Sequence, residues 1–311
     1  MIVLPPIRIS KSAATNFMLL VTLSALWGAS YTFIRVGVAT IPPLTLMAVR
    51  TLVACLLLLA WMSLNDISMP KESMYWRRFF VQALLNSVVP FTLIAWAEQS
   101  VEAGLATILN SASPILVFLA TWGITRHEQV TPQKLAGVAA GFLGIALIVG
   151  TSAFSGIGQQ ALPQLAIVLA TVCYAGAAIY GHSFRGLPPI VPAAGSLFMG
   201  SLVLVPASLL VDHPWTLHPS VQSVAALLAL SVLSTAVAFV IYFRLVQTLG
   251  SVGTTAQAYL RVPIGVGIGV VFLDESLSVV AWIGMVCVML GVAAMTFSKT
   301  SRQTQGATFR T

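Results

Sequence analysis

The sequence has very few charged residues: Asp, Glu, Lys and Arg together make up 7% of its 311 residues, whereas hydrophobic residues make up 58%. A water-soluble domain carries about 25% charged residues, so this chain has too few to cover a surface that faces water. Its mean hydropathy of +0.96 indicates that lipid surrounds most of the chain. The composition therefore excludes an ordinary soluble globular fold.

Cysteine is also scarce, and the three cysteines lie far apart inside apolar runs, at Cys55, Cys173 and Cys287. Because they form no CxxC pair and have no neighbouring His, we predict neither a metal site nor a disulfide framework. The sequence lacks a GxxxxGK[ST] loop, which argues against direct use of ATP, and it lacks an HExxH motif. No His/Asp/Glu cluster or Ser/Lys dyad is evident either. We therefore expect no cofactor and no enzymatic activity.

Runs of about 20 apolar residues, the length that a helix needs to cross a bilayer, recur along the chain. They predict ten spans, at 17–37, 43–63, 77–97, 104–125, 133–150, 162–181, 190–211, 221–243, 251–272 and 279–297. The predicted fold class is an all-α integral membrane protein with ten transmembrane helices.

The basic residues fall on one side of this map. If both termini lie on the same side, the loops on that side hold every Lys and Arg outside the spans. The opposite loops hold no Lys or Arg, and their charged residues are all acidic: Glu98, Glu102, Asp212, Asp274 and Glu275. By the positive-inside rule, both termini are then cytoplasmic, in the cell (inner) membrane. The net charge of +7 reflects this orientation, so we expect no nucleic-acid partner.

The two halves of the map share an internal repeat. The matching residues are Pro42/Pro43 with Pro188/Pro189, Gly104 and Pro114 with Gly253 and Pro263, and Glu128, Gly137 and Gly144 with Glu275, Gly284 and Gly291. Since each half holds an odd number of helices, the second would be inverted relative to the first, as in many secondary transporters. The predicted domains are a cytoplasmic segment 1–16, a first five-helix repeat 17–150, a linker 151–161, an inverted second repeat 162–297 and a cytoplasmic tail 298–311.

These motifs resemble the drug/metabolite transporter superfamily, specifically its ten-helix EamA-type members. The resemblance extends from about residue 17 to residue 297, and it also includes Leu26-Trp27-Gly28-Ala29-Ser30 and Arg50 after the Pro42/Pro43 entry. Within the family, the chain is most similar to the YddG-type exporters of aromatic amino acids. The resemblance implies export of amino acids, aromatic or hydrophobic, and of related small metabolites. One departure is that Ser196 stands at the position matching Arg50.

The candidate substrate site combines aromatic rings with polar groups at mid-span depth, since an amphipathic solute needs both. The residues predicted to bind substrate are Trp27, Tyr31, Arg50, Asn86, Trp96, Asn110, Tyr174, Gln257, Tyr259 and Arg261. An unpaired cation is costly inside the bilayer, so we expect Arg261 to contact a substrate carboxylate. Arg50 either has the same role or pairs with a carboxylate such as Glu98. The alternative for the aromatic residues is an interfacial belt.

Two prolines in the fourth and ninth spans, Pro114 and Pro263, are the gating candidates. Proline removes one backbone hydrogen bond and permits a bend, and a bend would allow a helix to close alternately toward each side. The alternative is that both prolines are static kinks.

Acidic residues are missing from the middle of every predicted span, and Glu98 lies near an outer end. Proton-driven antiporters commonly use a buried carboxylate, so we expect a facilitated carrier that works by alternating access. The alternative is a proton-coupled antiporter of drugs, sugar phosphates or other metabolites; a channel or a membrane-embedded enzyme is less favoured. The expected partners are a small-molecule substrate and the lipid bilayer. The oligomeric state stays open, with a monomer as the simplest case.

Overall fold

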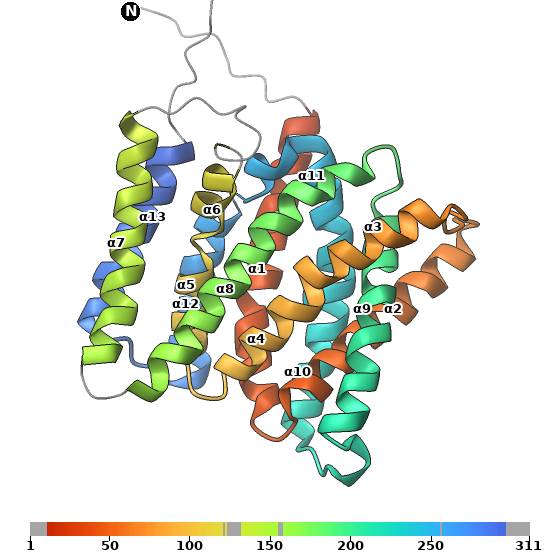
Figure 1. The fold of residues 1–311 in the computed structure, drawn as a ribbon, viewed down its shortest axis with the longest axis horizontal. Coiled ribbons are helices and arrows are strands. Elements are labelled where there is room, and N and C mark those ends of the chain that lie inside the picture. Colours follow the sequence, from red (N-terminus) through yellow and green to blue (C-terminus); the bar gives the residue numbers. More distant parts are fainter. Residues whose placement is uncertain (1–10, 121, 123–131, 155–157, 256, 297–311) are drawn as a thin grey trace, which may run out of the picture.

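The computed structural model describes residues 11–120, 122, 132–154, 158–255 and 257–296, and within these ranges it is helical without any strand (Figure 1). The first half contains α1 (Lys11–Val38), α2 (Pro43–Leu64), α3 (Ser73–Ala83), the π-helical η1 (Leu84–Val88), α4 (Val89–Ala97), α5 (Ala103–Asn110), α6 (Ser113–Ala120) and α7 (Pro132–Phe154). The second half contains α8 (Gly158–Tyr180), the 3-10 turn η3 (Gly181–Phe184), α9 (Ile190–Val211), the 3-10 turn η4 (Pro214–Thr216), α10 (Val221–Ser231), the π-helical η5 (Val232–Val237), α11 (Ala238–Thr255), α12 (Ala258–Leu273) and α13 (Val279–Thr296).

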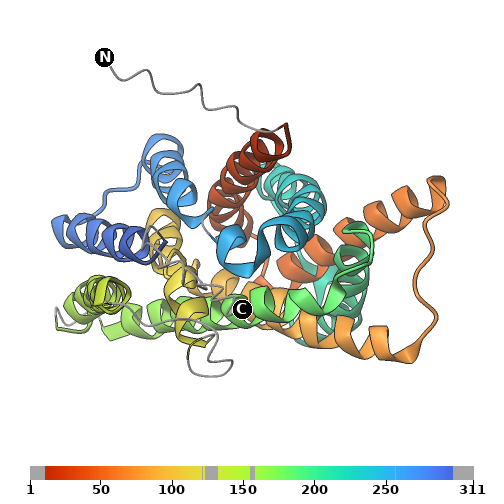
Figure 2. The same ribbon diagram turned by 90° about the horizontal axis from the view of Figure 1, so that it is seen from above.

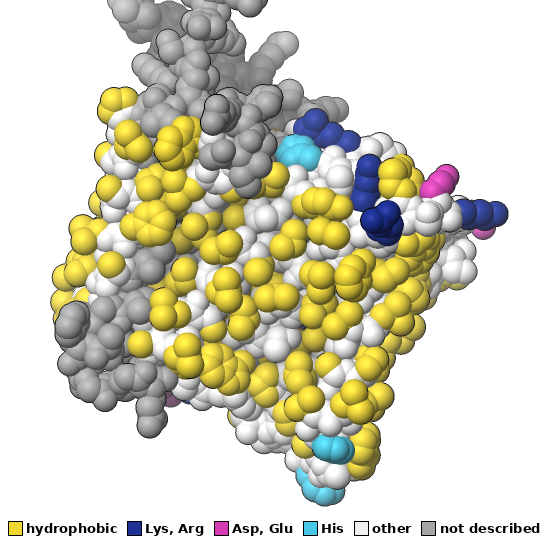
Figure 3. Space-filling view, viewed as in Figure 1, with side chains coloured by type: hydrophobic (Ala, Val, Ile, Leu, Met, Phe, Trp, Pro, Cys, Tyr) yellow, Lys and Arg dark blue, Asp and Glu magenta, His cyan; other side chains and the backbone are white. Residues whose placement is uncertain are grey.

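Many of these helices present apolar surface to their surroundings. Seven described helical stretches are long and apolar enough to cross a membrane, and three shorter apolar helices fall at the predicted fifth, ninth and tenth spans. Phe17, Leu210 and Phe272 are 63%, 77% and 74% exposed, which is favourable in lipid and costly in water. Figure 3 shows hydrophobic side chains across the middle of one face, with Lys and Arg toward its upper margin. The prediction of an all-helical membrane protein is confirmed.

Helical structure continues beyond the predicted end of the eighth span. The elements α10, η5 and α11 follow one another without a break from Val221 to Thr255, so the predicted loop between 243 and 251 is wrong. Gly250 in this stretch weakens a helix by only about 1 kcal/mol. Leu245 and Val246 are fully buried there, and this tertiary packing outweighs the weak local signal for a turn.

Elements of the two halves pack against one another in matching pairs. The helix α4 of the first half packs on α8 of the second half, and in the same way α10 and α11 of the second half pack on α1 of the first half. Likewise, α5 and α6 pack on α8, and α12 packs on α1. The helices α2 and α9 form one further pair, and α7 and α13 another. Figure 2 shows α7 and α13 at one edge of the molecule and α2 and α9 toward the other. These main contacts between the halves thus have counterparts in which the halves exchange roles.

Glycine residues permit the close approach of α7 and α13. A Cβ atom on Gly291 would lie 2.5 Å from the carbonyl oxygen of Gly137, and a Cβ atom on Gly144 would lie 2.7 Å from that of Gly284. The repeat matches Gly137 with Gly284 and Gly144 with Gly291, so these two contacts are equivalent. Such small-residue contacts let helix backbones meet without side chains between them.

Two π-helical turns interrupt α3/α4 and α10/α11 at the same place in the repeat. Asn86 in η1 and Thr235 in η5 are 149 residues apart, the separation that also relates the two Gly-to-Pro segments. Pro90 supplies no N–H for the carbonyl of Asn86. The hydroxyl of Thr235 donates to the carbonyl of Leu230, five residues earlier, at 2.7 Å. Insertions of this kind widen a helix locally, and π turns often mark functional sites.

We expect Gly291→Ala to lower the free energy of unfolding by about 1–3 kcal/mol, because the new methyl group has no space against α7 and overpacking forces the backbone to shift. Thermal unfolding of the purified protein in detergent would measure the change.

The matched control is Gly267→Ala in α12, where a Cβ atom meets nothing within 4 Å. This variant should be neutral or slightly stabilising, since Ala favours a helix over Gly. Equal losses of stability in the two variants would contradict the assigned role of the α7–α13 contact.

Candidate functional site

A cavity lies between the two halves; about 670 Å³ in and around it, counting space open to solvent, is free of protein atoms. Both halves contribute to its wall through α1, α2, α4, α6, α8, α11 and α12. Small-molecule sites are typically concave and lined by apolar and aromatic side chains with a few polar groups, and this cavity has such a lining. The cavity is therefore the candidate functional site.

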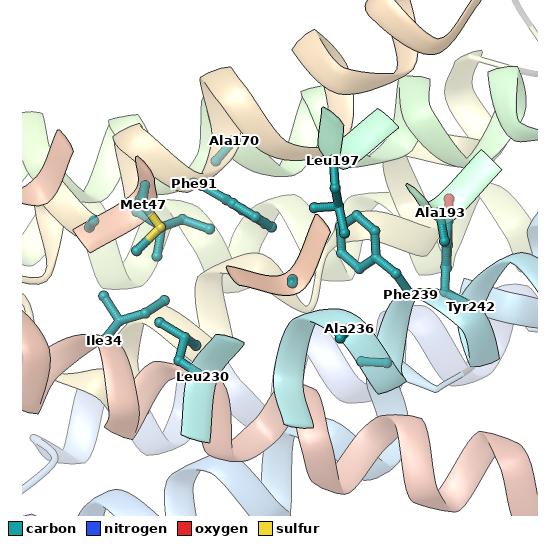
Figure 4. Packing of buried hydrophobic residues seen from close by; sticks show 14 of the residues in the cluster. Ile34, Met47, Phe91, Ala170, Ala193, Leu197, Leu230, Ala236, Phe239 and Tyr242 are labelled. Carbon is teal, nitrogen blue, oxygen red and sulfur yellow. The ribbon is translucent and has the colours of Figure 1, made fainter. Parts of the chain in front are cut away.

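Aromatic rings form much of the cavity wall. They belong to Trp27, Tyr31, Phe91, Tyr174, Phe239 and Tyr242. The rings of Trp27 and Tyr242 have centroids 5.4 Å apart, and those of Phe91 and Phe239 are 6.1 Å apart. Figure 4 shows Phe91 and Phe239 among the apolar side chains that hold them in place. This wall suits an apolar or aromatic body.

Arg261 is held in the cavity wall by a backbone carbonyl. Its Nη2 donates to the carbonyl oxygen of Asn110 at 2.9 Å, and its side chain is 4% exposed. Within a continuous helix this carbonyl would accept from residue 114, but Pro114 has no N–H. The helix is interrupted between α5 and α6 at this point. Proline thus leaves an acceptor free for a buried guanidinium.

The same asparagine orients Tyr31. The amide Nδ2 of Asn110 donates to the hydroxyl of Tyr31 at 2.5 Å, and the hydroxyl of Ser113 donates to the carbonyl oxygen of Asn110 at 3.1 Å. Tyr31 and Ser113 line the cavity, whereas Asn110 is fully buried beside it. Asn110 therefore links Arg261 to Tyr31.

Arg50 lines the cavity from α2 and has neutral partners. Its Nε donates to the hydroxyl of Thr235 at 2.7 Å, and its guanidinium carbon is 3.7 Å from the centroid of the Phe91 ring. The structure gives Arg50 these partners in place of the carboxylate of Glu98 that the sequence offered as an alternative. Because a cation over a ring face is attracted to it, Arg50 is fixed in place without losing its charge to a counter-ion.

Among the residues that the structure describes, three buried polar atoms of cavity-lining side chains have no hydrogen-bond partner: Nδ2 of Asn86, Oε1 of Gln257 and Nε of Arg261. Buried polar groups are almost always satisfied, so these atoms indicate where a ligand would bind. None of the described lining residues is acidic. The cavity therefore offers two cations, a further donor and an acceptor to one solute.

The structure brings most of the predicted site residues together. Seven of the ten line the cavity: Trp27, Tyr31, Arg50, Asn86, Tyr174, Gln257 and Arg261. Asn110 lies directly behind the wall, and the side chains of Tyr259 and Pro114 lie outside the described part of the structure.

Two predicted residues face outward. Trp96 is 41% exposed and contributes nothing to the cavity wall, so its predicted place at the site is wrong; it belongs with the aromatic residues near span ends. Pro263 is also exposed, on the outer side of α12. Sequence reasoning missed Phe91 and Phe239, because a Phe in a membrane helix faces lipid as readily as it faces a cavity. The neighbouring Pro90 was a signal that could have found Phe91.

We expect Thr235→Val to lower the free energy of unfolding by about 1–3 kcal/mol, because it leaves the buried Nε of Arg50 without an acceptor. The matched control is Thr171→Val, where a fully buried hydroxyl bonds only to the carbonyl of Ile167 in its own helix. Thermal unfolding of both variants would measure the difference, and a cost at Thr235 no larger than that at Thr171 would rule out a role in holding Arg50.

Known proteins resemble this chain over most of its length. It is 26% identical to the uncharacterized inner membrane transporter YedA of Escherichia coli strain K12 over 287 residues, which cover 91% of each chain. It is 24% identical to protein PecM of Dickeya dadantii strain 3937, over 84% of this chain and 85% of that protein. A protein of known crystal structure shares the fold, with a TM-score of 0.65 at 16% identity over 91% of this chain and 97% of the other.

The family comparison agrees with the internal repeat. The model of the EamA-like transporter family matches residues 15–150 and matches again over residues 162–297. These two matches cover most of the chain, so the protein belongs to the EamA-like transporter family.

Proposed function

We propose that this protein is a secondary transporter that exports amino acids, aromatic or hydrophobic, and related small metabolites through the central cavity. The observation that carries this proposal is the pairing of two buried guanidinium groups with aromatic walls, without an acidic residue in the described lining. A guanidinium binds a carboxylate strongly because both partners are charged and their geometries match. A solute with a carboxylate and an apolar body fits these two requirements.

The unpartnered polar atoms support a zwitterionic solute. Nε of Arg261 and Nδ2 of Asn86 are free donors for a carboxylate, and Oε1 of Gln257 is a free acceptor for an ammonium group. Trp27 and Tyr242 provide ring faces for the side chain of the solute. A sugar phosphate would use the same arginines, but its hydroxyl groups would leave these aromatic rings without an apolar partner. The cavity therefore favours an amino acid over a sugar phosphate.

We further propose ten membrane-crossing helices arranged as two inverted repeats, 17–150 and 162–297, with both termini cytoplasmic. In support, α1 and α8 run in opposite directions in Figure 1, and the glycine contacts of α7 and α13 exchange roles between the halves. The lysines and arginines of the predicted cytoplasmic loops support the orientation. The proposed preference for aromatic amino acids, as in the YddG-type exporters, rests on the cavity wall.

Alternating access requires that one end of the bundle can close while the other opens. At the proposed outer end, the carboxylate of Glu275 accepts from the backbone N–H groups of Ala103 and Gly104 at 2.7 and 2.8 Å. Oδ2 of Asp212 accepts from the backbone N–H of Thr45 at 2.7 Å. Both carboxylates belong to the second half, and both bind helix N-termini of the first half, where negative charge is favoured. We propose that these contacts close the outer end.

We expect Arg261→Gln to weaken binding of L-phenylalanine about tenfold or more, since a hydrogen bond to a charged group contributes about 1.5–3 kcal/mol. Binding of phenethylamine, which lacks the carboxylate, should change much less. Ligand-induced shifts of the melting temperature, recorded over a concentration series, would measure both affinities.

Arg244→Gln is the control, because Arg244 is an exposed arginine of α11. It should leave both affinities unchanged. If Arg261→Gln bound L-phenylalanine as tightly as the unmodified protein, the proposed carboxylate contact would be wrong. If glucose 6-phosphate gave a shift and amino acids gave none, the proposed substrate class would be replaced by sugar phosphates.

A further inference from the structure

Glu98 lies one helical turn beyond the cavity, at the residue that follows α4. Phe91 and Ile94 line the cavity from α4. Glu98 is four residues after Ile94 and seven after Phe91, and residues at these spacings lie on one face of a helix. The side of α4 that faces the solute therefore continues into this carboxyl group.

The carboxyl group of Glu98 is buried without a partner. The side chain is 0% exposed, and neither Oε1 nor Oε2 has a hydrogen-bond partner in the described structure. Arg35, the nearest cation on α1, donates from Nη1 to the backbone carbonyl of Glu98 instead. The carboxylates of Glu275 and Asp212 at the same end are, by contrast, bonded to backbone N–H groups. Glu98 is thus left without the contacts that would keep it ionised.

The surroundings of Glu98 favour its neutral form. Burial raises the pKa of Glu98 well above its usual range; Arg35 opposes this shift, Glu275 adds to it and Arg50 opposes it. Tyr31 on α1 is a further titratable group whose interaction with Glu98 is electrostatic. Desolvation exceeds the attraction of both arginines, because an ion that loses water without gaining hydrogen bonds is strongly disfavoured. Burial without hydrogen-bond partners therefore favours the protonated carboxyl group over the carboxylate.

Closure of the outer end and protonation of Glu98 are linked. If the contacts of Glu275 and Asp212 open, water reaches Glu98 and its pKa returns toward the ordinary value of about 4.3. Since the closed arrangement has the higher pKa, the proton stabilises closure at low pH, and this stabilisation is lost as the pH rises through the raised pKa. Glu98 therefore couples proton binding to the state of the outer end.

We propose that Glu98 binds and releases one proton in each transport cycle, so that a solute leaves through the central cavity in exchange for a proton. The proton is taken up when the outer end is open, and the neutral side chain then allows that end to close. When the inner end opens, water in the cavity, one helical turn away, solvates the carboxylate of Glu98, lowers its pKa again and accepts the proton. The inference rests on the transport function proposed above, and it replaces the expectation of a facilitated carrier.

Proton binding is tested without any solute. We expect the reconstituted protein to show an infrared carbonyl band of a protonated carboxyl group that disappears only at a pH above the ordinary range of glutamate. Glu98→Gln should lack this band, and Glu98→Asp should restore a carboxyl band. Glu102→Gln is the matched control at the same end of the molecule, and it should keep the band of Glu98. A band that persists in Glu98→Gln would overturn the assignment.

Coupling is tested with labelled L-phenylalanine in proteoliposomes, with the membrane potential held at zero by potassium and valinomycin. When the pH of the lumen is about one unit below that of the medium, one-to-one exchange should drive up to about tenfold accumulation of L-phenylalanine in the lumen. Glu98→Gln should lose this accumulation and retain L-phenylalanine exchange at equal pH. Glu98→Asp and Glu102→Gln should still accumulate the solute.

The two proposals fail in different ways. Saturable exchange of L-phenylalanine that does not respond to the pH gradient, or accumulation that persists in Glu98→Gln, would overturn the proton coupling and leave the transport function standing. Absence of any L-phenylalanine exchange by the unmodified protein would overturn the proposed substrate class itself.

Discussion

The cavity depends on a cation, Arg261, that is buried in the first turn of the membrane helix α12. A guanidinium group in such a place needs acceptors, and almost every backbone carbonyl of a helix is already occupied. Pro114 solves this problem because it cannot donate to the carbonyl of Asn110, which then accepts from Arg261 at 2.9 Å. The missing N–H of Pro114 in the first half thereby lets the carbonyl of Asn110 hold Arg261 of the second half in place. The contact also joins the halves at the level of the cavity.

Deviations from the regular α-helix position several other cavity residues. The π-helical turns η1 and η5 place Asn86 and Thr235 at corresponding positions of the two halves. Asn86 lines the cavity directly, whereas Thr235 holds Arg50 through its hydroxyl. The same backbone device therefore serves two different purposes. The repeat preserves the geometry of the helix and lets the side chains diverge, as the pairing of Arg50 with Ser196 also illustrates.

Apolar contact and polar contact are divided between different parts of the bundle. The helices α7 and α13 meet through glycine backbones at one edge and contribute nothing to the cavity wall. Cross-half hydrogen bonds lie instead around the cavity and toward both ends of the bundle, as those of Arg50 with Thr235, of Asp212 with Thr45 and of Arg78 with Ser183 illustrate. Lipid provides no hydrophobic driving force between helices, so close packing secures the edge of the bundle. Polar contacts, which water can replace, lie where the bundle has to open.

The sequence by itself determined the membrane environment, the positions of most helices, the repeat and seven of the cavity residues. These follow from composition, from the length of apolar runs and from unusual polar residues within them, all of which are local properties of the chain. Only the tertiary structure decided that Trp96 faces outward, that Phe91 and Phe239 face inward and that helix α11 continues to Thr255. In a membrane helix both the lipid-facing side and the inward side are apolar, so periodicity does not distinguish them. The isolation of Glu98 likewise depended on which groups from other helices surround it, and a linear sequence does not contain that information.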